Sequence, residues 1–205
     1  MTTSLLSRID IVRQLVRAHV PAEALERLAV EQTLSLLAAV DDPFARATLR
    51  GHITGSAVVL DEAGEHVLLV WHHSLGRYLQ PGGHSEPGDA TPLETAIRET
   101  TEETGVRVGE PGKLVHVDVH TIPVRGPEAA HRHHDLRFVF VVAADAAPRL
   151  PLGSRTSGWV RVKELDAYDV DPSFRRALES ATRSASLNSE SETDQTSRPG
   201  ATGIG

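Results

Sequence analysis

One segment of this chain constrains its fold more than any other, because it carries both a start and a stop signal for a helix. Thr91 is a suitable N-cap, Pro92 suits the first helical position, and Glu94 completes a Thr-x-x-Glu capping box. Gly105 provides the C-terminal stop. These signals predict a helix over residues 92–104.

The predicted helix has two chemically different sides. At 100° per residue, a core-facing stripe is formed by Leu93, Ala96, Ile97, Thr100 and Thr104. The acids Glu99, Glu102 and Glu103 gather on another side, next to Arg98. Acids three and four positions apart have β-carbons roughly 5–6 Å from one another and repel. One arginine cannot balance them, whereas a hard divalent cation would turn the repulsion into coordination. For the acids taken alone, a solvated helix face is the ordinary alternative.

The acids belong to a longer pattern that begins at Gly82-Gly83 and ends with Arg98-Glu99-x-x-Glu102-Glu103-x-Gly105. The stretch over residues 82–106 resembles the Nudix box, and a looser resemblance covers about residues 51–180. It implies an α/β (α+β) fold, with a Nudix-type mixed β-sheet sandwiched between α-helices. It also implies hydrolysis of a nucleoside diphosphate linked to another moiety, with Mg²⁺ or Mn²⁺ as cofactor.

The resemblance also implies roles for residues of the box. Glu99, Glu102 and Glu103 match the metal-binding glutamates, and Arg98 matches the arginine that orients them. Gly82 matches a glycine whose carbonyl reaches a metal in some members. We therefore expect the metal ligands among these residues, and the catalytic groups in Glu102, Glu103 and Arg98.

The sequence departs from the family pattern at several points. One extra residue precedes the helix, which should lengthen the loop before it without rotating the acids. Asp89 stands where the family usually has glutamate, and Thr100 replaces an aliphatic residue in the core stripe. A helical threonine can bond its hydroxyl to an earlier carbonyl, so the second change should be tolerated. Residues 153–158, before Trp159, contain no acid where some members supply a further catalytic glutamate.

A second group of polar residues precedes the apolar strand predicted over residues 136–144. It consists of Glu128, His131, His133, His134 and Asp135. Such a group can bind a metal, relay a proton or contact phosphates, and zinc is one candidate ion. A surface loop rich in histidine is the alternative interpretation. We take His133 and Asp135 as further catalytic candidates, because they could replace the acid that residues 153–158 lack.

Three further residues are candidates for substrate binding. Gly83 and His84 directly follow Gly82, and Arg77 lies in the segment 73–80. In the family that the box resembles, base and sugar recognition lies in variable segments, here 1–50, 73–80 and 120–135. The sequence therefore predicts a nucleotide-type substrate without naming it.

The remaining pattern divides the chain into three parts. Residues 1–50 have helical periodicity, with a break before Pro21, and we expect a packing or dimerisation element there. Residues 51–183 have the strand pattern of the Nudix-like domain, with strands predicted at 53–60, 66–71, 114–124, 136–144 and 159–162 and a helix at 172–185. Residues 184–205 are rich in Ser, Thr and Glu, and this composition predicts a disordered tail.

Composition excludes several classes of function. The chain has no cysteine, which excludes disulfides, Cys-ligated zinc and thiol catalysis and fits a cytoplasmic location. Its net charge of −7 argues against nucleic-acid binding. No apolar run is long enough for a membrane span, and no signal peptide is expected. These features are compatible with a homodimer, in which a second copy of the chain would bind through the N-terminal helices.

Three functions fit these features. The first is a metal-dependent pyrophosphohydrolase. The second is a binding or sensor module of the same fold that holds a nucleotide or sugar-nucleotide with little or no catalysis. The third is isomerisation of an isoprenoid diphosphate, which would be expected to use a cysteine, and the chain has none.

Overall fold

The computed structural model describes residues 4–124 and 129–195, with side chains described as far as residue 184. The helices are α1 (Leu5–Ala18), α2 (Ala24–Ala39), α3 (Pro92–Thr104) and α4 (Pro172–Gln195), with a 3₁₀ helix, η1, at Val162–Ala167. The strands are β1 (His52–Asp61), β2 (His66–His72), β3 (Arg77–Leu79), β4 (Gly82–His84), β5 (Lys113–Ile122), β6 (His131–Val142) and β7 (Ser157–Arg161).

These strands form one mixed sheet, as predicted. The central order is β3-β2-β1-β6-β5, while β4 pairs with β1 and β7 with β2. The β1–β6 pair is parallel, with His52 opposite His133 and Thr54 opposite Asp135. The pairs β1–β2, β1–β4, β2–β3, β2–β7 and β5–β6 are antiparallel. The parallel pair brings together two segments that are far apart in the sequence.

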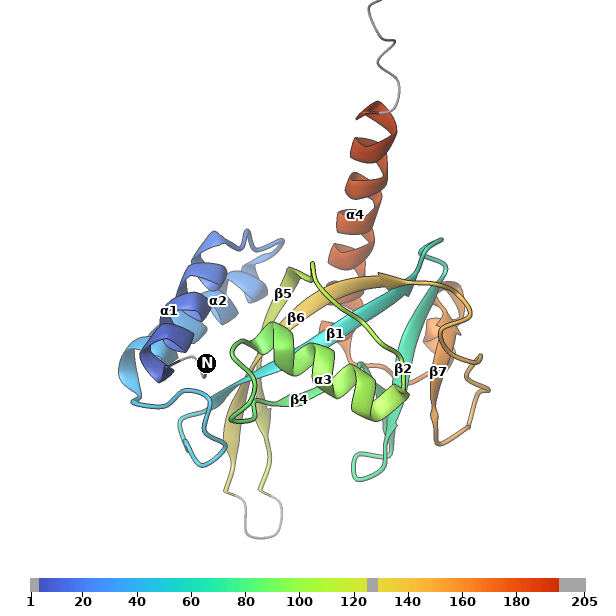
Figure 1. Cartoon of the computed structure of the whole chain (residues 1–205). Helices are drawn as coiled ribbons and strands as arrows, with labels where there is room; N and C mark the ends of the chain where they lie inside the picture. Colours follow the sequence, from blue (N-terminus) through green and yellow to red (C-terminus); the bar gives the residue numbers. More distant parts are fainter. Residues whose placement is uncertain (1–3, 125–128, 196–205) are drawn as a thin grey trace, which may run out of the picture.

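Helices cover both faces of the sheet (Figure 1). Alternate residues of β1 belong to different cores, because successive side chains of a strand point to opposite faces. Ile53 and Val59 lie in one core with Ala96 of α3. Val58 and Leu60 lie in the other core, with Phe174 of α4. The result is the predicted sheet between helices.

The two N-terminal helices pack onto the sheet. Their buried residues Val12, Val16, Leu36 and Leu37 join the core on the α3 side. A buried acid adds a polar connection, because the Glu26 carboxylate accepts hydrogen bonds from the backbone N–H of Ala22 at 2.6 Å and of Val117 in β5 at 3.1 Å. Its Oε1 also lies 2.7 Å from Nε2 of His19. The boundaries at residues 50 and 183 stay a prediction.

Helix α3 has the predicted limits and caps. The Thr91 hydroxyl accepts the N–H of Glu94 at 3.2 Å, and Gly105 ends the helix with φ of 75°. The Thr100 hydroxyl donates to the Ala96 carbonyl at 2.6 Å, as predicted. The Glu94 carboxylate differs from an ideal capping box, because it accepts the N–H of Ala90 at 2.7 Å.

The structure differs from the sequence-based interpretation at three places. The histidine segment is not a loop: His131, His133, His134 and Asp135 lie within β6, while Glu128 lies outside the described residues. The short strands β3 and β4 were not predicted, because three residues are too few to show an alternating pattern. Helix α4 runs to Gln195, past the predicted end at residue 185, and the remainder of the expected tail lies outside the described residues.

No helix in the described ranges is long and apolar enough to cross a membrane.

Candidate active site around helix α3

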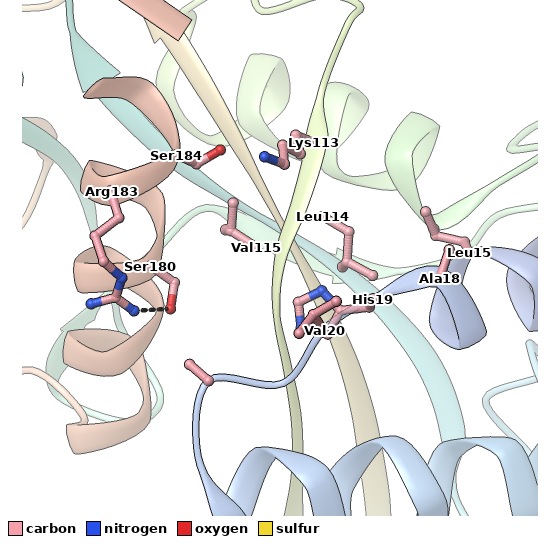
Figure 2. A pocket seen from close by; sticks show the side chains of 11 residues that line it. Leu15, Ala18, His19, Val20, Lys113, Leu114, Val115, Ser180, Arg183 and Ser184 are labelled. Carbon is pink, nitrogen blue, oxygen red and sulfur yellow. Dashed lines mark hydrogen bonds between the residues drawn. The ribbon is translucent and has the colours of Figure 1, made fainter. Parts of the chain in front are cut away.

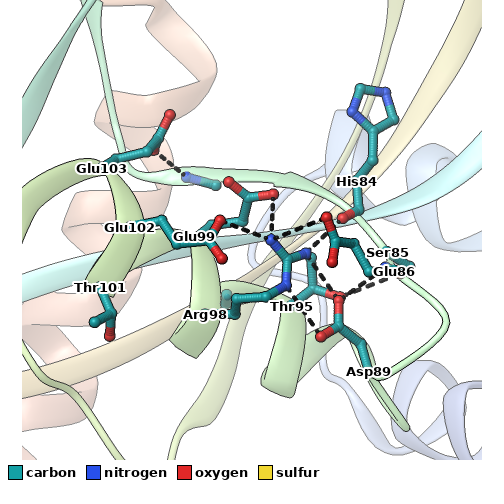
Figure 3. A network of polar contacts seen from close by, with 12 residues as sticks. His84, Ser85, Glu86, Asp89, Thr95, Arg98, Glu99, Thr101, Glu102 and Glu103 are labelled. Carbon is teal, nitrogen blue, oxygen red and sulfur yellow. Dashed lines mark hydrogen bonds and ion pairs between the residues drawn. The ribbon is translucent and has the colours of Figure 1, made fainter.

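The acidic side of α3 lies against the glycine strand β4 (Figure 3). The backbone N–H of Gly82 donates to Oε2 of Glu103 at 3.0 Å. A side chain at Gly83 would place its Cβ only 2.4 Å from Oε1 of Glu99. The missing side chain therefore lets the carboxylate reach the strand. Two glutamates one helical turn apart thus contact two consecutive glycines.

Arg98 links the acids to the loop before the helix. Its Nη1 donates to Glu99 at 3.0 Å and to Glu102 at 3.1 Å. Its Nη2 donates to Oδ2 of Asp89 at 2.9 Å and to the carbonyl of His84 at 2.8 Å. One planar guanidinium therefore fixes the positions of two glutamates, the end of β4 and the loop, because its donors are held in a rigid fork.

Asp89 holds Arg98. Its carboxylate is buried and also accepts the N–H of Glu86 at 2.9 Å and the Thr95 hydroxyl at 3.0 Å. Burial opposes ionisation, but the hydrogen bonds from Arg98 and from the Glu86 backbone outweigh it and lower the pKa of Asp89. An ionised Asp89 with these donors orients the arginine that in turn orients Glu99 and Glu102.

The electrostatics of the acids fit a divalent cation. Burial is the largest cause that raises the pKa of Glu99, and the charges of Glu102 and Asp89 add to it against the opposing effect of Arg98. Burial of the Glu103 carboxylate, with the charges of Glu99 and Glu102, raises its pKa to about 7, although the residue as a whole is exposed. Among the described residues Glu103 forms no ion pair. Hard oxygen ligands with unbalanced negative charge are what Mg²⁺ and Mn²⁺ prefer.

The structure brings most of the predicted site residues together and separates one. Gly82, Gly83 and His84 lie beside the glutamates, in contact with Glu103, Glu99 and Arg98 respectively. Arg77 makes its contacts elsewhere. Among the described residues, its guanidinium donates a hydrogen bond to the Asp169 carbonyl at 3.0 Å. Its interactions therefore link β3 to the segment before α4.

The residues predicted next to the strand 136–144 have three different environments. Nε2 of His133 lies 3.2 Å from Nε2 of His84, next to the glycine strand. His134 points toward α2, where its Nδ1 lies 3.0 Å from the Thr33 hydroxyl. Asp135 is 2% exposed. Its carboxylate contacts Thr54, Ser56, Gln80 and Arg137. A carboxylate occupied by so many donors is poorly placed to accept a proton from water, so its contacts favour a structural role for Asp135.

Arg137 is the partner of Asp135 that the sequence analysis missed. Its Nε donates to Asp135 at 2.9 Å, and its Nη1 donates to Ser173 of α4 at 2.8 Å. The signal was present, because His133, Asp135 and Arg137 alternate with a period of two and so share one face of a strand. A loop interpretation of the segment concealed it.

A pocket of about 460 Å³ lies away from these residues, between the segment joining α1 to α2, β5 and α4 (Figure 2). Leu15, Val20, Leu114 and Val115 are among its lining residues, and Arg183 donates to Ser180 at 2.9 Å on one wall. None of the lining residues belongs to the acidic cluster or to β4. We therefore place the candidate active site at α3 and β4.

A mixed sheet between helices, with this acidic helix against a glycine strand, defines a Nudix domain. The NUDIX domain family model matches residues 51–180, and the chain belongs to that family. A curated relative is the probable DHNTP pyrophosphohydrolase of Lactococcus lactis subsp. cremoris, 37% identical over 89 residues. That match covers 42% of this chain and 52% of the relative, so the chain spans about half the length of the relative.

Solved structures of the family are similar as well. A NUDIX family hydrolase from Clostridium perfringens is 24% identical, with 67% of this chain and 97% of that chain covered and a TM-score of 0.41. The NUDIX domain of Shewanella oneidensis NrtR, complexed with ADP ribose, is 18% identical, with 73% and 96% covered and a TM-score of 0.49.

Proposed function

We propose that this protein is a metal-dependent pyrophosphohydrolase that cleaves the diphosphate linkage of a nucleoside diphosphate joined to another moiety. The observation that carries the proposal is the cluster of Glu99, Glu102 and Glu103 against Gly82-Gly83, with Glu103 lacking a cationic partner in the described structure. Such a cluster costs free energy unless a cation neutralises it. Membership of the Nudix family and similarity to a curated pyrophosphohydrolase support the same function.

Glu99, Glu102 and Glu103 would hold the cation, with the Gly82 carbonyl as a further oxygen ligand. Mg²⁺ or Mn²⁺ bound there supplies Lewis acidity to the phosphoryl group and lowers the pKa of water. Arg98 keeps Glu99 and Glu102 in place, and Asp89 keeps Arg98 in place. The protein thus provides orientation before any substrate arrives, which is the main protein contribution to phosphoryl transfer.

We assign the proton-accepting role to Glu103. In the reaction, the oxygen of a water molecule bonds to phosphorus while the bond from phosphorus to the bridging oxygen breaks. The proton of that water needs an acceptor within hydrogen-bond reach. Glu103 lies among the acids that would hold the cation, and its carboxylate is positioned by the N–H of Gly82 at 3.0 Å. Gly83 continues along the same strand and is our candidate for substrate contact. His84, the other predicted contact, has its ring nitrogen Nε2 at 3.2 Å from Nε2 of His133.

The decisive experiment is an activity panel. Nucleoside triphosphates, sugar nucleotides, dinucleoside polyphosphates and ADP-ribose would be assayed with Mg²⁺, with Mn²⁺ and with a chelator. DHNTP joins the panel because the curated relative is named for it. We expect turnover of at least one compound, only with a divalent cation present. Turnover that is unaffected by the chelator would contradict the proposal.

A binding module of the same fold is the second candidate function. The observation in its favour is the segment 153–158, which contains no acid before β7. The same panel separates the two candidates, since a binding module would hold one of the compounds tightly without product formation. The acids of α3 and their contacts favour the enzyme.

A homodimer, a cytoplasmic location and the absence of nucleic-acid binding stay predictions. The outer sides of α1 and α2 expose Leu6, Leu25 and Leu28, which is consistent with a contact between copies. Sedimentation equilibrium of the whole chain tests the homodimer.

A further inference from the structure

Four histidines from three strands meet beside the glycine strand: His52 of β1, His84 of β4, and His131 and His133 of β6. The ring of His52 lies about 5 Å, between centroids, from each of the other three. One ring nitrogen from each residue lies within 4.8 Å of the others. The parallel pairing of β1 with β6 creates this group, since it places His52 opposite His133.

The hydrogen bonds of His131 fix the form of its ring. Its Nδ1 lies 2.9 Å from the carbonyl of Ala129, which can only accept, so Nδ1 carries the proton. In the neutral ring Nε2 then presents a lone pair, and this nitrogen lies 3.2 Å from Nε2 of His133. A metal-binding histidine is commonly oriented in this way, by a carbonyl at its other nitrogen.

Hydrogen bonds between the four rings cannot give every facing pair of ring nitrogens a shared proton. Nε2 of His133 faces Nε2 of both His131 and His84, each at 3.2 Å. A neutral imidazole nitrogen has either one proton or one lone pair, so it can complete only one of these two contacts. One nitrogen–nitrogen contact is therefore always left without a shared proton.

His52 gives a second, independent indication of a ligand. Its side chain is fully buried, and neither ring nitrogen makes a hydrogen bond of normal geometry with the described residues. The Thr48 backbone lies near the ring of His52 and favours its protonated form, the smallest of the effects on its pKa. A buried imidazole whose nitrogens have no hydrogen-bond partner among the described residues is a ring that a bound metal ion would satisfy.

We propose that His52, His84, His131 and His133 bind one transition-metal ion of the Zn²⁺ type, at a site separate from the glutamates of α3. Zn–N bonds of about 2.0–2.1 Å in a tetrahedron place ligand nitrogens about 3.3 Å apart. Two pairs in the group already lie at 3.2 Å, and the others, at up to 4.8 Å, need only a modest approach. Four nitrogen ligands suit Zn²⁺ and its neighbours, and they suit Mg²⁺ poorly.

A site with four protein ligands leaves no open position, so we assign the ion a structural role. It would tie the first residue of β1 to β6 and to the last residue of β4. The carbonyl of His84 accepts a hydrogen bond from Arg98, and the preceding residue Gly83 contacts Glu99. The ion would thus hold in place the strand against which the acidic side of α3 lies.

The test uses the full chain, stripped of metal by a chelator and then titrated with Zn²⁺ in the presence of excess Mg²⁺. The excess Mg²⁺ competes for the carboxylates of α3, so that the titration measures Zn²⁺ binding to the histidines. We expect one Zn²⁺ per chain, with a raised Tm. Co²⁺ in place of Zn²⁺ should give the intense visible absorption of a tetrahedral complex. The readout does not depend on hydrolysis, so it is independent of the proposed function.

Matched variants locate the site. His84→Ala and His131→Ala should each weaken Zn²⁺ binding about 100-fold or more, because loss of a direct ligand should cost at least as much as the roughly 10–100-fold typical for loss of an outer-shell partner. His73→Ala, at an exposed histidine outside the group, should bind like wild type, as should Glu99→Gln combined with Glu103→Gln. Circular dichroism would confirm the fold of each variant. The absence of a stoichiometric Zn²⁺ site in wild type under excess Mg²⁺ overturns the proposal, as does an octahedral Co²⁺ spectrum or a site lost only in the glutamate variant.

Discussion

The backbone N–H of Gly82 donates a 3.0 Å hydrogen bond to Oε2 of Glu103, and this contact joins β4 to the last turn of α3. A helix side with three acids is thereby held close to two glycines, which have no side chain with which to neutralise it. This arrangement suits the metal-binding role that we propose for the acids, because carboxylates fixed before a cation binds lose little conformational freedom when it does.

Replacement of Glu103 by glutamine should have opposite effects on activity and on stability. We expect turnover to fall about 100-fold or more, because an amide binds a hard cation poorly and accepts no proton. Without metal, the same change should be neutral or stabilising by less than about 1 kcal/mol, since it removes one of several like charges at a partly exposed position. Steady-state kinetics and thermal melts in a chelator measure the two effects.

The matched control for this prediction is Glu62→Gln, an exposed acid in the turn between β1 and β2. It should change neither quantity. Glu103→Gln that retains full activity would return the acids to the interpretation of a solvated helix face.

Gly83→Ala should damage the site through Glu99. The added Cβ would lie 2.4 Å from Oε1 of Glu99, so the carboxylate must move. We expect kcat/KM to fall at least about tenfold, because small misplacements of catalytic groups are costly. Gly88→Ala is the control in the neighbouring loop, since no atom lies within 4 Å of its added Cβ. Equal kinetics for the two variants would show that the Gly83–Glu99 contact has no catalytic importance.

Arg98→Lys tests whether the guanidinium acts by orientation. Lysine keeps the charge but cannot replace donors directed at Glu99, Glu102, Asp89 and the His84 carbonyl. We expect kcat/KM to fall about 10- to 100-fold, with Arg107→Lys, an exposed arginine just after α3, as the control. A role limited to net charge predicts no loss, and measurement of kcat/KM for both variants decides between the two roles.

Glu26→Gln should loosen the N-terminal helices from the sheet. It weakens a buried acceptor shared by Ala22, Val117 and His19, and we expect a loss of about 1–3 kcal/mol in the free energy of unfolding. Glu31→Gln, an exposed acid on the same helix, should have no measurable effect. Urea denaturation at pH 7 measures both.

The effect of Glu26 should depend on pH in a defined direction. Burial opposes its ionisation, but the hydrogen bonds from His19 and the Ala22 backbone outweigh burial and lower the pKa in the folded protein. Its stabilising contribution is therefore present above the unfolded pKa of about 4.5 and is lost as the pH falls through the folded value. The difference between wild type and Glu26→Gln should shrink on acidification, and a difference that grows would contradict this assignment.

His134→Ala should affect stability without removing the site. Its ring faces α2 and lies 3.0 Å from the Thr33 hydroxyl, whereas His133 on the other face belongs to the histidine group. We expect a loss of about 2 kcal/mol in the free energy of unfolding, with Zn²⁺ affinity unchanged in the folded protein. Chemical denaturation and Zn²⁺ titration measure the two quantities, and a large loss of Zn²⁺ affinity would show that the faces are not independent.

Local signals in the sequence determined much of this protein. The caps at Thr91 and Gly105, the apolar stripe and the acids of α3 are all set by residues within one or two helical turns, so periodicity and capping reveal them. The resemblance to the Nudix box supplied the roles that we propose for Arg98 and the glutamates. The longer strands were also predictable, because alternation over many residues is a strong signal.

Only the tertiary structure decided which distant residues meet. His52 joins His131 and His133 because β1 pairs with β6 in parallel, and no local pattern encodes that register. The same pairing places Asp135 opposite Thr54, where Asp135 is buried. Arg77, the first residue of β3, donates a hydrogen bond to the Asp169 carbonyl and not to the acids of α3. The physical reason is that strand pairing and helix docking minimise the free energy of the whole core, which a residue's neighbours in sequence do not determine.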